Sequence, residues 1–129
     1  MVHAFVPQHL LDFAEYLEKL ELSDENYDLQ CKHRTIVNRA YLSTFLHANE
    51  WIINNGKCND VRDYSKNSVG YHTAIHIALT KLNKRKIARK YKEFINLRVN
   101  ADYNIVTIIT LQDAQKAIDL AKEICSALQ

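Results

Sequence analysis

Residues 34–54 read RTIVNRAYLSTFLHANEWIIN, and this stretch decides the fold class. Its apolar residues recur every three or four positions, the spacing that places side chains on one face of an α-helix. Asn54-Asn55-Gly56 then supplies a helix stop. We therefore predict a long central helix over residues 26–54. Its wide apolar stripe comprises Val37, Ala40, Tyr41, Phe45, Ala48 and Ile52.

The same spacing predicts helices on both sides of this one. The first begins near Pro7 and ends at about Leu22. A polar loop at 57–68 separates the central helix from a third helix at 71–82. A further apolar stripe over residues 91–105 defines the fourth helix.

A fifth helix begins at Thr110-Leu-Gln-Asp113, a variant of the capping box, and continues to Leu128. Residues 105–110 are rich in β-branched side chains but have no partner strand, so we predict a helix end and a loop there. With only 2 Gly and 1 Pro in 129 residues, the chain lacks the turn residues that sandwiches and barrels need. We predict one all-α domain of five helices spanning residues 1–129.

Cysteine content and hydropathy bear on the compartment. Cys31, Cys58 and Cys125 are odd in number and widely spaced, which argues against a disulfide framework and predicts free, buried thiols. No apolar run approaches the roughly 18 to 20 residues of a membrane-spanning helix, and the N-terminus has no signal-peptide pattern. We expect a cytoplasmic protein that is neither secreted nor membrane-inserted.

Charge is segregated along the chain although the formal net charge is only +2. Residues 12–28 hold seven acids and one base, whereas residues 81–92 hold seven bases and no acid. This segregation predicts a surface for a polyanion such as RNA, or complementary faces within a dimer. Two solvated helix faces are the alternative. The seven bases are Lys81, Lys84, Arg85, Lys86, Arg89, Lys90 and Lys92.

Few catalytic motifs are compatible with this sequence. Because Gly56 and Gly70 are the only glycines, neither a phosphate-binding loop nor a G-x-S-x-G nucleophile elbow can form. His72 and His76 lie four residues apart on a predicted helix and could reach one metal ion, but a third ligand is missing. We expect a packed or surface histidine pair, and neither a metal nor a cofactor.

Charged residues interrupt two of the apolar stripes. Arg39 lies in the central helix, and Arg98, Asp102 and Tyr103 lie in the fourth. Buried charges are costly unless they are paired. Arg98 and Asp102 are four residues apart in the less favourable order, base before acid, so we predict an Arg39–Asp102 ion pair between the helices. A polar contact with a purely structural purpose is the alternative to a functional site.

Three stretches resemble the HEPN superfamily, in particular its small single-domain bacterial and archaeal members. Residues 34–48 resemble the family's S-R-A-Y-Y-x-x-F-H-x-A helix, with Asn38 in place of serine and Leu42 in place of the second tyrosine. Residues 97–103, LRVNADY, match the pattern L-R-x-x-A-D-Y in full. The alanine-rich helix at 114–128 is also similar.

The resemblance implies a five-helix up-and-down bundle, usually a homodimer, and a role in RNA-centred conflict such as toxin–antitoxin pairs or antiviral defence. Many members are metal-independent RNases that use R-x(4–6)-H, in which arginine holds the phosphate and histidine transfers protons. In this chain no arginine has a histidine at that spacing. Asp102 and Tyr103 stand where the resemblance would place it.

Two functional hypotheses follow, besides a purely structural dimerisation protein. The first is a module that binds RNA or a nucleotide through residues 81–92, or binds a partner such as a nucleotidyltransferase antitoxin. The second is a metal-independent RNase toxin with an altered catalytic site built from Arg39, Arg98, Asp102 and Tyr103. Aspartate and tyrosine side chains do not ordinarily titrate near neutral pH, so we expect binding with little nuclease activity.

Overall fold

The structure, a computed structural model, describes residues 5–20, 29–65 and 69–129. Within these ranges it contains five α-helices, one short 3-10 helix and no strand, which confirms the predicted all-α fold. None of the described helices is both long and apolar enough to cross a membrane. The elements are α1 (Gln8–Lys19), α2 (Leu29–Gly56), η1 (Val61–Tyr64), α3 (Tyr71–Lys81), α4 (Arg85–Tyr103) and α5 (Leu111–Ala127).

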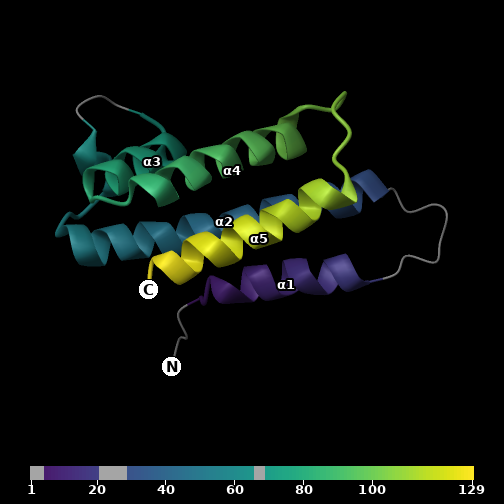
Figure 1. Cartoon of the computed structure of the whole chain (residues 1–129), viewed down its shortest axis with the longest axis horizontal. Helices are drawn as coiled ribbons and strands as arrows, with labels where there is room; N and C mark the ends of the chain where they lie inside the picture. Colours follow the sequence, from purple (N-terminus) through teal and green to yellow (C-terminus); the bar gives the residue numbers. More distant parts are fainter. Residues whose placement is uncertain (1–4, 21–28, 66–68) are drawn as a thin grey trace.

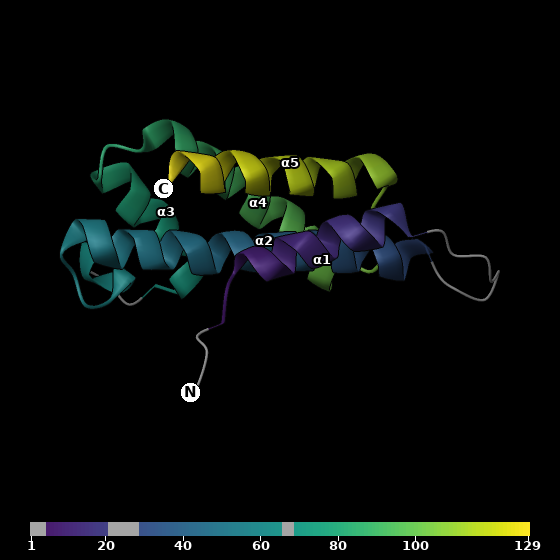
Figure 2. The ribbon, with the colours of Figure 1, turned by 90° about the horizontal axis from the view of Figure 1, so that it is seen from below.

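The four longer helices α1, α2, α4 and α5 alternate in direction along the long axis of the molecule (Figure 1). Helix α2 is central, since it packs against α1, α3, α4 and α5. Both views show α5 lying along α2 (Figures 1 and 2). The short helix α3 lies at the end of the bundle where α2 ends, and it packs mainly against α4 and η1.

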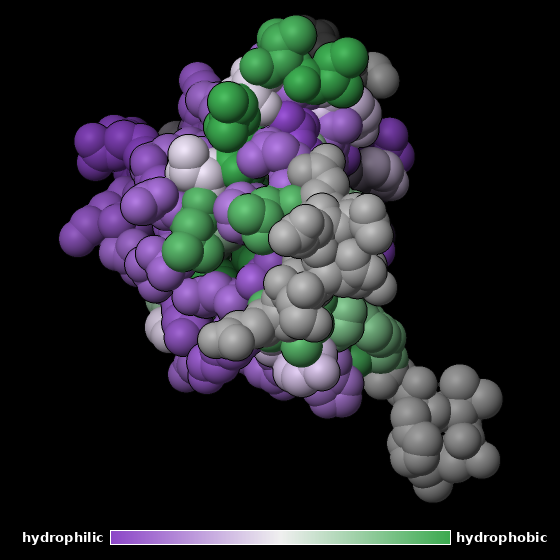
Figure 3. All heavy atoms as spheres, turned by 90° about the vertical axis from the view of Figure 1, so that its right-hand side faces the viewer, coloured by the Kyte–Doolittle hydropathy of each residue, from purple (hydrophilic) through white to green (hydrophobic). Residues whose placement is uncertain are grey.

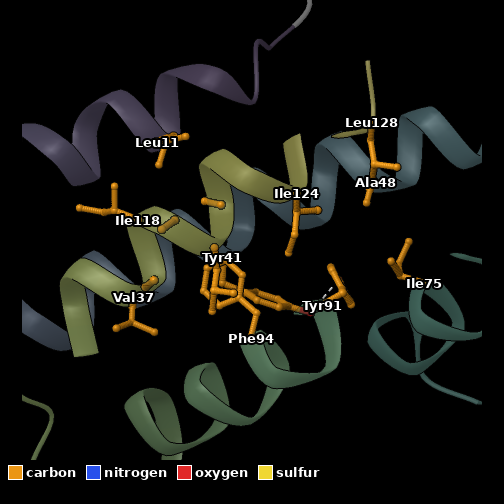
Figure 4. Close-up of a cluster of buried hydrophobic side chains, with 14 of the residues drawn as sticks. Leu11, Val37, Tyr41, Ala48, Ile75, Tyr91, Phe94, Ile118, Ile124 and Leu128 are labelled. Atoms are coloured by element: carbon orange, nitrogen blue, oxygen red, sulfur yellow. Dashed lines mark hydrogen bonds between the residues drawn. The ribbon is translucent and has the colours of Figure 1, made fainter. Parts of the chain in front are cut away.

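The predicted apolar stripe of α2 forms the middle of the core. Val37, Ala40, Ala48 and Ile52 are fully buried, and Tyr41 is nearly so. Around them lie buried side chains from α1, α3, α4 and α5 (Figure 4). Burying one large apolar side chain contributes about 1.5 to 3 kcal/mol, so this continuous core supplies the main stabilisation of the fold.

Several helix boundaries differ from the predictions. Helix α1 ends at Lys19, before the predicted end at about Leu22, which lies outside the described residues. Helix α4 begins at Arg85 rather than near Tyr91, because arginine, lysine and alanine are good helix formers even without a strong apolar stripe. It ends at Tyr103, so Ile105 lies in the following loop and is 90% exposed. The polar loop at 57–68 contains η1, whose N-terminus is capped by Asp60; residues 66–68 lie outside the described part.

Helix α2 and helix α5 are close to the predictions. Helix α2 extends to Gly56, and residues 26–28 of its predicted start lie outside the described residues. The capping box of α5 is confirmed. The Thr110 hydroxyl accepts a hydrogen bond from the Asp113 backbone N–H at 3.1 Å, and the Asp113 carboxylate accepts one from the Thr110 N–H at 2.9 Å.

The prediction of three buried thiols is partly wrong. All three cysteines are free, and Cys125 is buried, but Cys58 is half-buried and Cys31 is exposed. Cys31 lies near the start of α2, where it faces away from the core, so its small apolar side chain is not needed for packing.

An arginine of α2 holds the end of α4 and the first part of the loop that follows it. The Arg34 guanidinium donates hydrogen bonds to the carbonyls of Asn100, Ala101, Asn104 and Thr107. The last carbonyls of a helix have no partners within it, and a cation there also interacts well with the helix dipole. Arg34 therefore ends α4 and fixes the path of the chain beyond it.

Candidate nucleic-acid interface

Arg98 and Asp102 form an ion pair on α4. Arg98 Nε lies 2.7 Å from Asp102 Oδ2, and the two side chains are 19% and 17% exposed. Arginine before aspartate is the less favourable order for a pair along a helix, but a residue of α2 also holds the aspartate. Asn38 Nδ2 donates to both carboxylate oxygens of Asp102, at 3.1 and 3.2 Å. The partner that α2 supplies to Asp102 is thus an amide.

The predicted Arg39–Asp102 ion pair is wrong. No ion pair among the described residues joins them, and Arg39 has no hydrogen-bond partner in that part of the chain. Consecutive helical residues are rotated by about 100°. When Asn38 faces α4, Arg39 therefore points elsewhere, and its side chain is half-buried. Arg39 lies outside the cluster that contains Arg98.

Tyr103 completes the polar group around Arg98. Arg98 Nη2 donates to Tyr103 Oη at 3.3 Å, and the guanidinium carbon lies 5.2 Å from the Tyr103 ring centroid, within the range of a cation–π contact. Tyr103 is 68% exposed. The structure thus brings together three of the four predicted catalytic residues, namely Arg98, Asp102 and Tyr103.

A chain of hydrogen bonds beneath this group was not predicted from the sequence. Tyr41 Oη lies 2.8 Å from Tyr91 Oη and 2.6 Å from Nδ1 of His72. Figure 4 shows Tyr41 and Tyr91 meeting beside Phe94 in the core. These residues come from α2, α4 and α3, so the chain joins three helices. In the sequence, Tyr41 and Tyr91 are members of apolar stripes, and only the fold shows that their hydroxyls meet.

We call the hydrogen-bonded series Tyr91–Tyr41–His72 the hydroxyl chain, and burial sets the protonation states of its three members. It raises the pKa of Tyr41 to about 12 and that of Tyr91 well above its ordinary value. Burial also lowers the pKa of His72, and the nearby positive charge of Arg98 lowers it further. Near pH 7 both tyrosines therefore keep their protons and His72 is neutral.

His72 and Arg98 lie against the same aromatic ring. The His72 ring centroid is 5.3 Å from that of Tyr41, and the Arg98 guanidinium carbon is 5.7 Å from it. His76 lies one turn further along α3. Its burial lowers its pKa, and the positive charge of Lys92 lowers it further. We call this line of His72, His76, Lys92 and Arg98 the α3–α4 seam. The two histidines, expected to be a packed or surface pair, are half-buried beside the cations of α4.

The basic stretch lies at the junction of α3 and α4, as predicted. Three of its seven bases have partners among the described residues. Lys90 pairs with Glu123 of α5 at 2.7 Å, the Lys84 Nζ lies 5.6 Å from the Trp51 ring centroid, and Lys81 donates to the Tyr64 carbonyl. Lys81 is nevertheless exposed, as are the remaining four bases. Spacings of three and four place Arg85, Arg89 and Lys92 on one face of α4. We call the exposed bases Lys81, Arg85, Lys86, Arg89 and Lys92 the basic face.

The described residues contain no group of three or more histidine, cysteine or carboxylate side chains close enough to hold a metal ion. The polar groups that the structure gathers at the site are guanidinium, ammonium, imidazole, hydroxyl and carboxylate groups. The guanidinium and ammonium groups are suited to holding phosphates.

Comparisons of the chain with protein-family models, with curated proteins and with solved structures found no match. The likeness to HEPN proteins accordingly stays a resemblance carried by the sequence motifs.

Proposed function

We propose that this protein is an RNA-binding module with little nuclease activity of its own. The observation that carries the proposal is the basic face, on which five exposed cations lie within twelve residues. The sequence of that stretch contains no acid, so no carboxylate within it offsets these charges. The resemblance to HEPN proteins supports the same function.

The basic face suits a phosphate backbone better than a small molecule. Each phosphate that a cation neutralises releases a counterion, which contributes affinity without base specificity. Arg85, Arg89 and Lys92 follow one line along α4, as a chain of phosphates would require. For about four contacts to single-stranded RNA, the logarithm of the binding constant should fall with the logarithm of salt concentration with a slope of about −3.

A homodimer and a role in toxin–antitoxin biology or antiviral defence are part of this proposal. Apolar side chains gather on the end of the molecule that carries the α4–α5 loop (Figure 3). Ile105, Val106 and Ile108 are exposed there on a loop that Arg34 fastens. An exposed apolar patch on a fixed backbone favours protein contact, whether with a second copy or with a partner such as a nucleotidyltransferase antitoxin. A cytoplasmic location likewise stays a prediction.

The test is the salt dependence of binding to a single-stranded RNA, measured by fluorescence anisotropy. We compare the Arg85→Gln/Arg89→Gln variant with Lys19→Gln/Lys122→Gln, which removes the same charge from α1 and α5. The first variant should bind at least tenfold more weakly and with a slope smaller by about 1 to 1.5. The second should stay within about threefold of the wild type. Equal losses in the two variants would show that only net charge matters and would refute the basic face.

The same preparations decide between binding and catalysis. Total RNA is incubated with the protein in the presence of a chelator, and cleavage is followed on a gel. We expect no cleavage above a buffer control. Metal-independent cleavage that both Arg98→Ala and Asp102→Ala abolish would replace the binding proposal with an RNase toxin whose site is built on α4.

A further inference from the structure

We infer that the α3–α4 seam binds one phosphodiester group of RNA, with the Arg98 guanidinium and the Nε2–H of His72 as its donors. This inference rests on the proposed function and deepens it, because it names one place where a phosphate is held. From its sequence position, His72 is expected only to be one of a packed or surface histidine pair, with no part in phosphate binding. The fold brings His72 of α3 and Arg98 of α4 to the same ring, that of Tyr41.

The hydroxyl chain fixes which nitrogen of His72 carries the proton. Tyr91 is fully buried, and its hydroxyl has one partner among the described residues, Tyr41 Oη. A buried hydroxyl hydrogen needs an acceptor, so Tyr91 donates to Tyr41. The hydrogen of Tyr41 must then go to Nδ1 of His72, which accepts it only when Nδ1 is unprotonated. The proton of the neutral ring therefore lies on Nε2.

The opposite arrangement leaves a buried hydrogen without an acceptor. If Nδ1 carried a proton, Tyr41 would accept it and donate to Tyr91, and the Tyr91 hydroxyl hydrogen would face the core unpaired. Protonation of both ring nitrogens has the same consequence. The burial of His72 and the charge of Arg98 act in the same direction, since both lower the pKa of the ring. His72 is thus held as a neutral hydrogen-bond donor.

Arg98 is held in place while keeping donors for a ligand. A guanidinium has five N–H groups, of which one is directed to Asp102 and one to Tyr103. The remaining three can reach phosphate oxygens, for which the planar fork is well suited. Asp102 is itself fixed by Asn38 of α2. Because Asp102 offsets the charge of Arg98, the seam should favour the single charge of a phosphodiester over the double charge of a phosphomonoester.

The same tautomer makes the seam a poor catalyst of RNA cleavage. Transesterification needs a base that takes the 2′-hydroxyl proton and an acid that protonates the leaving oxygen. His72 cannot take a proton at Nε2, which already carries one, and its lone pair on Nδ1 is engaged by Tyr41. The seam therefore holds a phosphodiester without breaking it.

The first experiment observes the tautomer directly. Long-range ¹H–¹⁵N spectra of the labelled full chain at pH 7 distinguish a protonated Nε2 from a protonated Nδ1. His72 should show the Nε2–H form. Titration with the dinucleoside monophosphate ApA should then shift the His72 Nε2 and Arg98 side-chain signals saturably, and adenosine monophosphate should bind more weakly. An Nδ1–H form, or unmoved His72 and Arg98 signals, would overturn the inference.

The second experiment uses variants of the two donors. Loss of one hydrogen bond to a charged ligand should weaken ApA binding by about tenfold or more in His72→Ala and in Arg98→Gln. Thr73→Ala, at an exposed position of α3 outside the seam, should bind within about twofold of the wild type. If Arg98→Gln unfolds, His72→Ala alone decides. Wild-type affinity in His72→Ala would refute the site.

A third measurement separates this site from the basic face. The Arg85→Gln/Arg89→Gln variant should keep ApA binding while it loses affinity for long RNA. If ApA binds normally but long RNA does not bind even to the wild type, the proposed function fails and the phosphodiester site stands. If long RNA binds with the expected salt dependence but ApA does not perturb His72, the site fails and the proposed function stands.

Discussion

Removing the hydroxyl of Tyr41 should destabilise the protein more than removing that of Tyr91. In Tyr41→Phe, the Tyr91 hydroxyl loses its partner while it remains fully buried. An unpaired buried hydroxyl costs about 1 to 3 kcal/mol. In Tyr91→Phe, Tyr41 keeps His72 as a partner, so the loss is that of one ordinary hydrogen bond, about 0.5 to 1.5 kcal/mol. Tyr16→Phe, whose hydroxyl lies on an exposed side chain, serves as the control.

The double variant Tyr41→Phe/Tyr91→Phe gives the sharper result. It leaves no tyrosine hydroxyl of this pair unpaired, so it should be no less stable than Tyr41→Phe alone, with an interaction free energy of about 1 to 3 kcal/mol between the sites. The assay is urea unfolding followed by circular dichroism, supported by thermal midpoints that move by about 3 to 5 °C for each kcal/mol. A double variant whose loss equals the sum of the two single losses would refute the hydroxyl chain.

Three further predictions follow from other contacts. Arg34→Ala should lower the free energy of unfolding by about 2 to 3 kcal/mol, since four carbonyls lose a charged donor, and Arg34→Lys should recover part of it in the same urea assay. Thr110→Ala should cost about 1 kcal/mol through loss of the α5 cap, and Thr110→Ser should restore most of it in thermal unfolding. Stability should fall between pH 7 and pH 5, because the pKa values of His72 and His76 in the folded state lie below the unfolded value of about 6.5 and the unfolded chain then binds more protons. Equal urea midpoints at the two pH values would contradict this, and a smaller pH effect is expected in His76→Gln.

The sequence is sufficient for the helices because their periodicity is local. The α2 stripe and the Thr110–Asp113 box depend on neighbours three and four residues apart, and both are present as predicted. The predicted start of α4 near Tyr91 is too late because the first turns of the helix are mostly basic, and a search for apolar periodicity does not detect them. The predicted helix includes Ile105 because it is apolar and lies at the helical spacing. In the structure α4 ends before it, where Arg34 binds the carbonyl of Asn104.

The polar site could be predicted only in part, because its contacts depend on how helices are rotated. Asn38 and Arg39 are adjacent in sequence, and charge alone favours Arg39 as the partner of Asp102. The helical phase selects Asn38 instead, since Arg34, Asn38 and Tyr41 recur at the spacing of one face. That spacing is visible in the sequence and is a signal that groups these three residues. The approach of His72 to Arg98 has no such signal, because it depends on the packing of α3 against α4.

The hydroxyl chain links the stability of the core to the chemistry of the seam. Tyr41 and Tyr91 are satisfied only while His72 accepts a hydrogen bond at Nδ1. A His72 that could act as a base at Nε2 would need its proton on Nδ1, and one buried tyrosine hydroxyl would then be unpaired, at a cost of about 1 to 3 kcal/mol. This cost corresponds to a roughly 5- to 150-fold preference for the donor tautomer. Phosphate binding and proton abstraction are thus alternatives at this histidine, and the buried tyrosines favour binding.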